Sequence, residues 1–248
     1  MIILSILFFV TALLYSSVGF GGGSTYLALL LIWGVPYTIF PVIALVCNII
    51  VVSGNSINFI RSKNTNLNLL FPYLIGSIPF AFIGGSITIE KSLFEILLFC
   101  ILLIAGIFLL IESKSFNKNQ IKINKIPKLM SIMIGSIIGF MSGIVGIGGG
   151  IFLSPVLFLL KAGYPKHITS SASLFILINS IFGIAGQLTK DRVLVELINY
   201  WPLFLIVFIG GQIGSLLNIK FLSNKRLALL TSFLVIFVAI RMGIKLIS

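Results

Sequence analysis

Ionisable side chains are scarce in this chain. Its 248 residues include five Asp or Glu, one His and two Cys, and only 9% of them are charged, where a soluble domain carries about a quarter. All five acids lie at the ends of apolar segments or in loops, and no carboxylate pair or metal-ligand set is visible. The sequence therefore predicts no enzyme, no catalytic residue, no metal and no cofactor.

Apolar residues fill the rest of the chain, at 58% of the residues and a mean hydropathy of +1.21. A helix that crosses a bilayer needs about 20 apolar residues, and such stretches follow one another almost without pause. We therefore predict an all-α polytopic membrane protein. Its apolar segments are Ile2–Val18, Ser24–Trp33, Tyr37–Ile60, Leu67–Ile89, Leu93–Ile111, Leu129–Val145, Ile151–Leu160, His167–Leu188, Leu194–Ile219 and Leu227–Ile247.

The net charge of +12 comes mostly from Lys and Arg in short loops between the apolar segments. Such loops usually face the cytoplasm. A basic chain can also bind nucleic acid, but no soluble domain is present to form a binding face, and we expect no nucleic-acid partner. The longest polar stretch, residues 113–128, is predicted to be a basic cytoplasmic linker, with both termini on the same side.

Two glycine runs interrupt the apolar pattern. Gly19-Phe20-Gly21-Gly22-Gly23 returns in the second half of the chain as Gly146-Ile147-Gly148-Gly149-Gly150, at an offset of 127. Glycine is a weak helix former, and within hydrocarbon exposed backbone is tolerated only where it faces protein or a water-lined cavity. Both runs therefore predict helix breaks inside the membrane, and each is followed by an apolar piece too short to cross.

Further matches extend this repetition along the chain. The turn Gly34-Val35-Pro36 corresponds to Gly163-Tyr164-Pro165 at an offset of 129, and Phe71-Pro72 corresponds to Trp201-Pro202 at an offset of 130. We predict two homologous membrane repeats, residues 1–112 and 129–248, with four long helices and one short half-helix each. Segment length favours about eight crossings and parallel repeats. Five crossings per repeat, with inverted repeats, stay open.

Broken helices at matching positions of duplicated halves indicate a transporter site near the midplane. A helix that begins after a break offers unpaired N–H groups and the positive end of its dipole to an anion, and neutral hydroxyls and amides can donate as well. Two alternatives compete with a carrier: an anion channel, and a membrane scaffold in which the glycines only pack helices. The candidate substrate-binding residues are Gly19, Gly21, Gly22, Gly23, Ser24, Thr25, Asn48, Gly146, Gly148, Gly149, Gly150, Ser170, Ser171 and Ser173.

The two glycine motifs, the two Gly-x-Pro turns, and residues Ala44–Asn48 and Ser170–Phe175 resemble the TauE/SafE family of sulfite and organosulfonate transporters. The resemblance implies a multi-pass protein of the bacterial inner membrane that carries small sulfur-containing anions. An inside-negative potential drives anions outward, which favours efflux. The implied partners are a small anionic substrate and the lipid bilayer, and a homo-oligomer stays an open alternative to a single copy.

Overall fold

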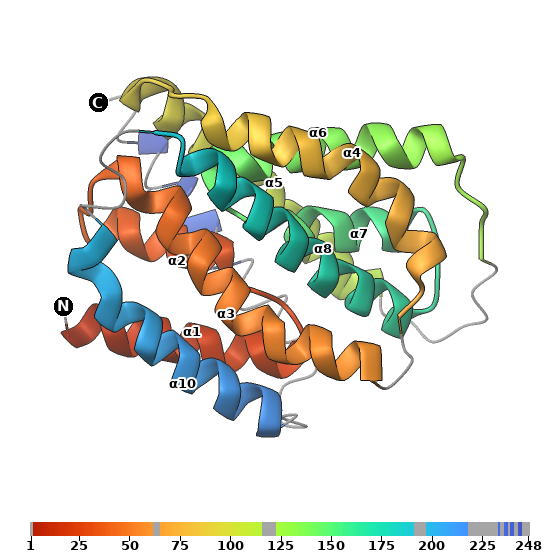
Figure 1. Cartoon of the computed structure of the whole chain (residues 1–248), viewed down its shortest axis with the longest axis horizontal. Helices are drawn as coiled ribbons and strands as arrows, with labels where there is room; N and C mark the ends of the chain where they lie inside the picture. The colour runs from red at the N-terminus through yellow and green to blue at the C-terminus, as the bar shows by residue number, and fades with distance from the viewer. Residues whose placement is uncertain are drawn as a thin grey trace.

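The computed structural model describes residues 2–61, 65–115, 123–190 and 197–217, together with residues 233, 236–237, 239–240 and 243–244. The described residues form helices joined by short loops (Figure 1), and the predicted all-α class is confirmed for them. The elements are α1 (Ile2–Val18), α2 (Gly23–Ile32), the 3-10 turn η1 (Tyr37–Ile39), α3 (Phe40–Arg61), α4 (Leu67–Ser86), α5 (Lys91–Ser115), α6 (Lys128–Val145), α7 (Gly150–Leu159), α8 (Pro165–Gln187), the 3-10 turn η2 (Ile198–Tyr200) and α10 (Trp201–Leu217).

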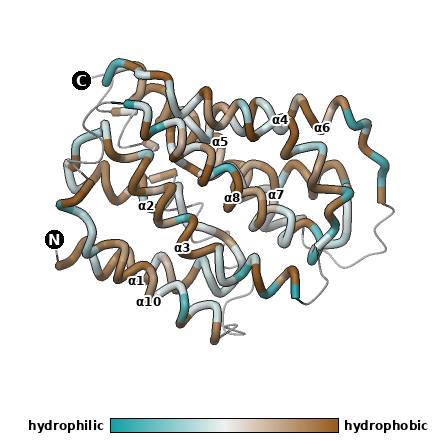
Figure 2. Tube along the Cα trace, in the orientation of Figure 1, coloured by the Kyte–Doolittle hydropathy of each residue, from teal (hydrophilic) through white to brown (hydrophobic). Residues whose placement is uncertain are grey.

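Six helices in the described part are long and apolar enough to cross a membrane, namely α3, α4, α5, α6, α8 and α10. Hydrophobic residues run along the helices (Figure 2), and large apolar side chains such as Phe71 and Leu216 are exposed on the outside of the bundle. This surface suits lipid rather than water, and the chain is a multi-pass membrane protein. The expected total of about eight includes α1, which has 17 residues, and Leu227–Ile247, which lies largely outside the described residues.

Both predicted helix breaks are present. Helix α1 ends at Val18 and α2 begins at Gly23, while α6 ends at Val145 and α7 begins at Gly150. The residues before the short helices, Gly22 and Gly149, have φ of 86° and 78°, in the left-handed region where a side chain is disfavoured. Helices α2 and α7 have ten residues each and are about 15 Å long, half of a hydrocarbon core of about 30 Å.

Glycines let two pairs of helices approach at backbone distance. On α6, Gly135 and Gly139 lie directly against the carbonyl groups of Tyr73 and Ser77 in α4. The residue numbers rise together along this contact, so α4 and α6 run parallel. Helices α1 and α10 pack in the same way, with Gly210 against the Phe9 carbonyl. Small residues serve this purpose in membranes because they allow close van der Waals packing.

The pair Gly84-Gly85 packs closely, as its sequence suggests. A Cβ atom on Gly84 would collide with the carbonyl of Phe140 in α6, and one on Gly85 would lie 2.5 Å from the carbonyl of Gly183 in α8. Helix α4 is therefore held on two sides by direct backbone contact.

We expect Gly139→Ala to lower the thermal stability of the purified protein by several degrees. Its Cβ would collide with the Ser77 backbone, which has no freedom to move within a packed helix pair, and overpacking typically costs about 1–3 kcal/mol. Gly54→Ala is the matched control, since its nearest neighbour would lie 3.4 Å away on a Ser215 side chain. Equal melting temperatures for the two variants would contradict the close α4–α6 contact.

The short helices turn the chain back after each break. The Asn124 N–H, just before α6, donates to the Lys161 carbonyl just after α7 at 3.0 Å, so α7 returns toward the side from which α6 starts. At the other end, the Gln187 amide at the end of α8 donates to the Gly143 carbonyl near the end of α6 at 2.7 Å. Helices α6 and α8 therefore run in the same direction, with α7 running back between their ends.

This reversal changes the expected placement of the N-terminus. Figure 1 shows the start of α1 at the opposite end of the bundle from residues 123–127, whereas the sequence led us to expect the termini and the linker on one side. The reason is that α2 and α7 return toward the side from which α1 and α6 start, so the chain changes direction at each break. The C-terminal residues 245–248 lie outside the described part of the chain.

Candidate functional site

The two glycine breaks meet around the side chain of Asn48, which lies on α3 and is fully buried. A Cβ atom on Gly21 would collide with Asn48 Oδ1, and Cβ atoms on Gly23 and Gly148 would lie 2.7 and 2.6 Å from Asn48 Nδ2. Asn48 Nδ2 donates to the carbonyl of Ile147, in the second break, at 3.2 Å. The Asn48 amide thus contacts both breaks, and only glycine fits at the three positions around it.

The place where the two breaks meet around Asn48 is called the crossing below. An apolar side chain and a hydroxyl complete it. Ile176, on α8, would lie 3.1 and 3.0 Å from Cβ atoms on Gly21 and Gly148, and Ser180 Oγ would lie 3.2 Å from the latter. Gly150 packs directly against Ile176 as well. The crossing therefore has a polar wall from α3 and a mixed wall from α8.

Several polar atoms near the crossing are buried without a hydrogen-bond partner. Asn48 Oδ1, Ser24 Oγ and Ser180 Oγ make no hydrogen bond in the described structure. Leaving such a group unpaired costs about 1–3 kcal/mol, which is a reason to expect a ligand or water at these atoms. The crossing keeps one acceptor and two hydroxyl groups available.

The short helices add backbone donors at the same place. The first helical bonds run from Thr25 N–H to the Gly22 carbonyl at 3.0 Å and from Phe152 N–H to the Gly149 carbonyl at 3.1 Å. The N–H groups that precede Thr25 and Phe152 lie in the first turn, where a helix has no internal acceptors. Both helix N-termini carry partial positive charge, so the crossing is electropositive without a charged side chain among the described residues.

The structure brings only part of the predicted site together. Asn48, Gly21, Gly23 and Gly148 meet at the crossing, and Ser24 and Gly150 start the helices that leave it. The Thr25 hydroxyl instead shares a hydrogen bond of 2.9 Å with the Tyr15 hydroxyl.

The remaining predicted glycines serve the packing of the breaks. Gly22 lies against Thr11 and Tyr15, Gly149 against Phe175 and Ile138, Gly19 against Phe59 and Thr169, and Gly146 against the backbone of Pro41.

The three predicted serines of α8, the helix that also carries Ile176, have different hydrogen-bond partners. The Ser170 hydroxyl donates to the His167 carbonyl at 3.1 Å, within its own helix, and the Ser173 hydroxyl pairs with the Ser56 hydroxyl on α3 at 3.3 Å. Ser171 is buried and its hydroxyl has no partner in the described structure. The density of hydroxyls on α8 was a weaker guide than the glycines.

Sequence reasoning missed the Ile147 carbonyl, Ile176 and Ser180. A backbone carbonyl gives no sequence signal. Ile176 packs against Gly150 in the second break as Asn48 packs against Gly23 in the first, and Ser180 lies one helical turn beyond Ile176. The offset of 129 that matches the flanking residues pairs Asn48 with Leu177, so the sequence alone does not point to Ile176 or Ser180.

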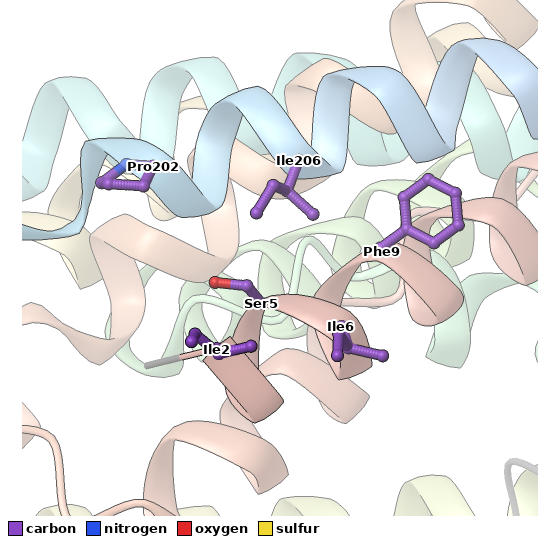
Figure 3. Close-up of a pocket in the computed structure, with 6 residues that line it drawn as sticks. All are labelled: Ile2, Ser5, Ile6, Phe9, Pro202 and Ile206. Carbon is purple, nitrogen blue, oxygen red and sulfur yellow. The ribbon is translucent and has the colours of Figure 1, made fainter.

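A separate groove between α1 and α10 does not resemble an anion site. It has a volume of about 490 Å³ and is lined by Ile2, Ser5, Ile6, Phe9, Pro202 and Ile206, and Figure 3 shows these side chains on the two helices. Ser5 supplies the one hydroxyl among them. The groove suits an apolar occupant and carries no charge for a substrate anion.

Comparison with known proteins identifies the family of the chain. The family model described as "Sulfite exporter TauE/SafE" matches residues 4–242. The chain belongs to the TauE/SafE family. The resemblance of the glycine motifs is thereby confirmed, and so is the expectation that the protein is a transporter and not an enzyme.

Three curated relatives of this TauE/SafE protein are named as probable membrane transporters. Protein y4hK of Sinorhizobium fredii is 30% identical and the match covers 93% of both chains. Protein MJ0441 of Methanocaldococcus jannaschii is 31% identical over 76% of this chain and 73% of its own. Protein YunE of Bacillus subtilis is 22% identical over 88% of this chain and 89% of its own. No solved structure matches the chain.

Proposed function

We propose that this TauE/SafE protein exports small sulfur-containing oxyanions, such as sulfite or organosulfonates, through the crossing of its two glycine breaks. The observation that carries the proposal is the buried Asn48 amide, held between the breaks beside unpartnered hydroxyls and two helix N-termini. Neutral donors and helix dipoles can hold an anion. Because no charged side chain of the described residues lies at the crossing, binding there stays weak enough for release.

We propose further that the chain is built from two inverted repeats. Contacts at the breaks support this pairing. Gly19 lies against Thr169 of the second half, and its counterpart Gly146 lies against Pro41 of the first half. In a similar way, Asn48 packs against Gly23 and Ile176 packs against its counterpart Gly150. Each break thus packs on the other repeat, and the hairpins α1–α2 and α6–α7 start from opposite ends of the bundle.

The direction of transport follows from electrostatics. An inside-negative membrane potential drives each anionic charge outward by about 2.3 kcal/mol per 100 mV. Export needs no coupling ion, and among the described residues no carboxylate lies at the crossing where a coupled proton would be held. Lys125 and Lys128, at the end of the bundle where α6 starts, favour a cytoplasmic position for that end.

The test is flux of radiolabelled sulfite from liposomes that contain the purified protein, under an imposed potential, with and without a pH or Na⁺ gradient. We expect saturable flux that follows the potential and ignores both gradients. A requirement for a gradient would contradict uncoupled export. Single-channel currents well above carrier turnover would assign the same site to a channel, and absence of flux for sulfite and for sulfonates would favour a scaffold.

A further inference from the structure

A pocket with a mixed polar and apolar lining, distinct from the crossing, lies at the end of the bundle where α6 and α8 finish. Its volume is about 100 Å³, room for about three water molecules at roughly 30 Å³ each and hence for one small oxyanion. The pocket is bounded by the start of α3, the junction of α4 and α5, and the ends of α6 and α8. Its lining includes Thr38, Pro41, Thr88, Ile144, Gln187 and Lys190.

Gln187 and Lys190 form a short hydrogen-bonded chain in this pocket. Lys190 Nζ donates to Gln187 Oε1 at 2.9 Å, and Gln187 Nε2 donates to the Gly143 carbonyl at 2.7 Å. Gln187 is fully buried, so its amide is held in one orientation. A lysine ammonium has three donors, and two of them remain available after the bond to Gln187.

The Lys190 ammonium is partly desolvated. Burial lowers the pKa of Lys190 from its ordinary 10.5 to about 8, so the side chain is still mostly protonated at neutral pH. Tyr37 is the other titratable side chain that lines the pocket. The neighbouring Glu90 and Lys91 are exposed and do not line it. Within the described residues, Lys190 therefore stands as a half-buried cation without an acidic partner.

The pocket lies beside the second glycine break. Pro41 lines the pocket, and its backbone lies directly against Gly146, the first residue of the break. Ile144, also in the lining, lies just before Gly146 in the chain. An anion that leaves the crossing past Ile147 toward this end of the bundle would next meet the pocket.

The opposite end of the bundle carries the corresponding residue types. Asn58 and Arg61, at the end of α3, correspond to Gln187 and Lys190 at an offset of 129. Asn58 adjoins Phe59, whose ring lies against Gly19 at the start of the first break. An amide followed one helical turn later by a cation thus stands near each break, at opposite ends of the protein.

We infer that the Lys190 pocket is a binding site for a small oxyanion at the mouth of the transport path, with the ammonium, the Thr88 hydroxyl and the fixed Gln187 amide around it. The assignment of the pocket to the path rests on the proposed function. The binding of an anion does not, and it can be measured without flux.

The first experiment measures the rate at which a small amine-reactive reagent modifies Lys190 in the purified protein, followed by mass spectrometry, with sulfate as the probe anion and gluconate as the bulky control. We expect sulfate to slow modification of Lys190 about three-fold or more, since a bound anion raises the fraction of the unreactive ammonium. Lys91, exposed at the same end of the protein, is the internal control. Equal rates with sulfate and gluconate would overturn the inference.

The second experiment compares Lys190→Gln, Lys190→Arg and Lys91→Gln by sulfite flux, with the labelled sulfite supplied on the side of the Lys190 pocket. We expect Lys190→Gln to raise the apparent KM about ten-fold, with the maximal rate changed less than about two-fold, and the other two variants to resemble the wild type. If Lys190 only capped the end of α8, Lys190→Gln would change the melting temperature and leave KM unaltered. That result would overturn the assignment of the pocket to the path.

The pH dependence of the apparent affinity for sulfite tests the role of the Lys190 charge. Above a pKa of about 8 the ammonium loses its charge, so the apparent affinity should fall between about pH 7 and about pH 9 in the wild type. Arginine stays charged throughout this range, so the ratio of wild-type to Lys190→Arg affinity should fall as pH rises. Taking the ratio removes the titration of sulfite itself. A flat ratio would contradict a role for the Lys190 charge.

The two proposals fail in different ways. Protection of Lys190 by sulfate without any wild-type flux would leave the pocket standing and reject export. Normal flux with no protection and an unaltered KM in Lys190→Gln would reject the pocket and leave export standing.

Discussion

Gly148→Ala should lower sulfite flux by about 100-fold or more, the equivalent of about 2.7 kcal/mol at ~1.36 kcal/mol per factor of ten. Gly148 has φ of +82°, and its Cβ would lie 2.6 Å from Asn48 Nδ2 and 3.0 Å from Ile176. The left-handed conformation alone costs about 1–2 kcal/mol with a side chain. The greater effect is at the site, because the methyl group would push Asn48 away from the Ile147 carbonyl and occupy the space between the breaks.

Gly34→Ala separates these two contributions. Gly34 also has a positive φ, of +67°, but nothing lies within 4 Å of its Cβ position. The control variant carries the conformational cost and leaves the crossing unchanged, so we expect its flux to stay within about two-fold of the wild type. Size-exclusion chromatography would show whether both variants insert and remain folded. Wild-type flux through folded Gly148→Ala would reject the crossing as the transport site.

Asn48→Leu should also abolish most of the flux. Leucine is close to asparagine in size but cannot donate to the Ile147 carbonyl, which it would leave unpaired at a cost of about 1–3 kcal/mol. The variant also removes the amide that presents a donor and an acceptor between the breaks. We expect a loss of about 100-fold in flux at a given sulfite concentration, measured in the same liposomes.

Asn55→Leu is the matched control for this loss. Asn55 lies on the same helix, is buried, and donates through Nδ2 to the Ser16 carbonyl of α1 at 2.7 Å. The two substitutions remove the same kind of inter-element hydrogen bond and should lower stability by similar amounts, about 1–3 kcal/mol each. Only Asn48→Leu should lose transport. Equal loss of flux in both would show that packing, and not the amide at the crossing, limits the rate.

The sequence predicted the breaks well because their cause is local. Glycine disfavours the helix wherever it stands, so Ile2–Val18 was expected and found as α1, and Val145 was expected and found as the end of α6. Which serines of α8 meet a break could not be predicted, for a geometric reason. Successive residues on a helix point about 100° apart, so Ser170, Ser171 and Ser173 face different neighbours, and the sequence does not tell which face meets a break.

Asn48 could be placed among the candidate residues, but its partners could not. They come from three stretches distant in sequence, namely both breaks and α8, and their meeting depends on the return of α2 and α7 toward the sides from which α1 and α6 start. That return gives no composition signal. Segment length favoured parallel repeats because a helix too short to cross was not counted as a pass of the chain. The direction of that short helix nevertheless decides on which side the next helix begins.

The pairing of Asn48 with Ile176 has a kinetic consequence. On the proposed inverted repeats these two residues have equivalent contacts at the centre, Asn48 with Gly23 and Ile176 with Gly150, yet one is an amide and the other a hydrocarbon. Exchanging the conformations of the two repeats converts an inward-facing carrier into an outward-facing one, and a perfectly symmetric centre would give the two forms equal energy. Here the polar contact belongs to one repeat alone, so the empty carrier should rest preferentially on one side of the membrane. Such a carrier rectifies: its rate constants for loading from the two faces differ even without a potential.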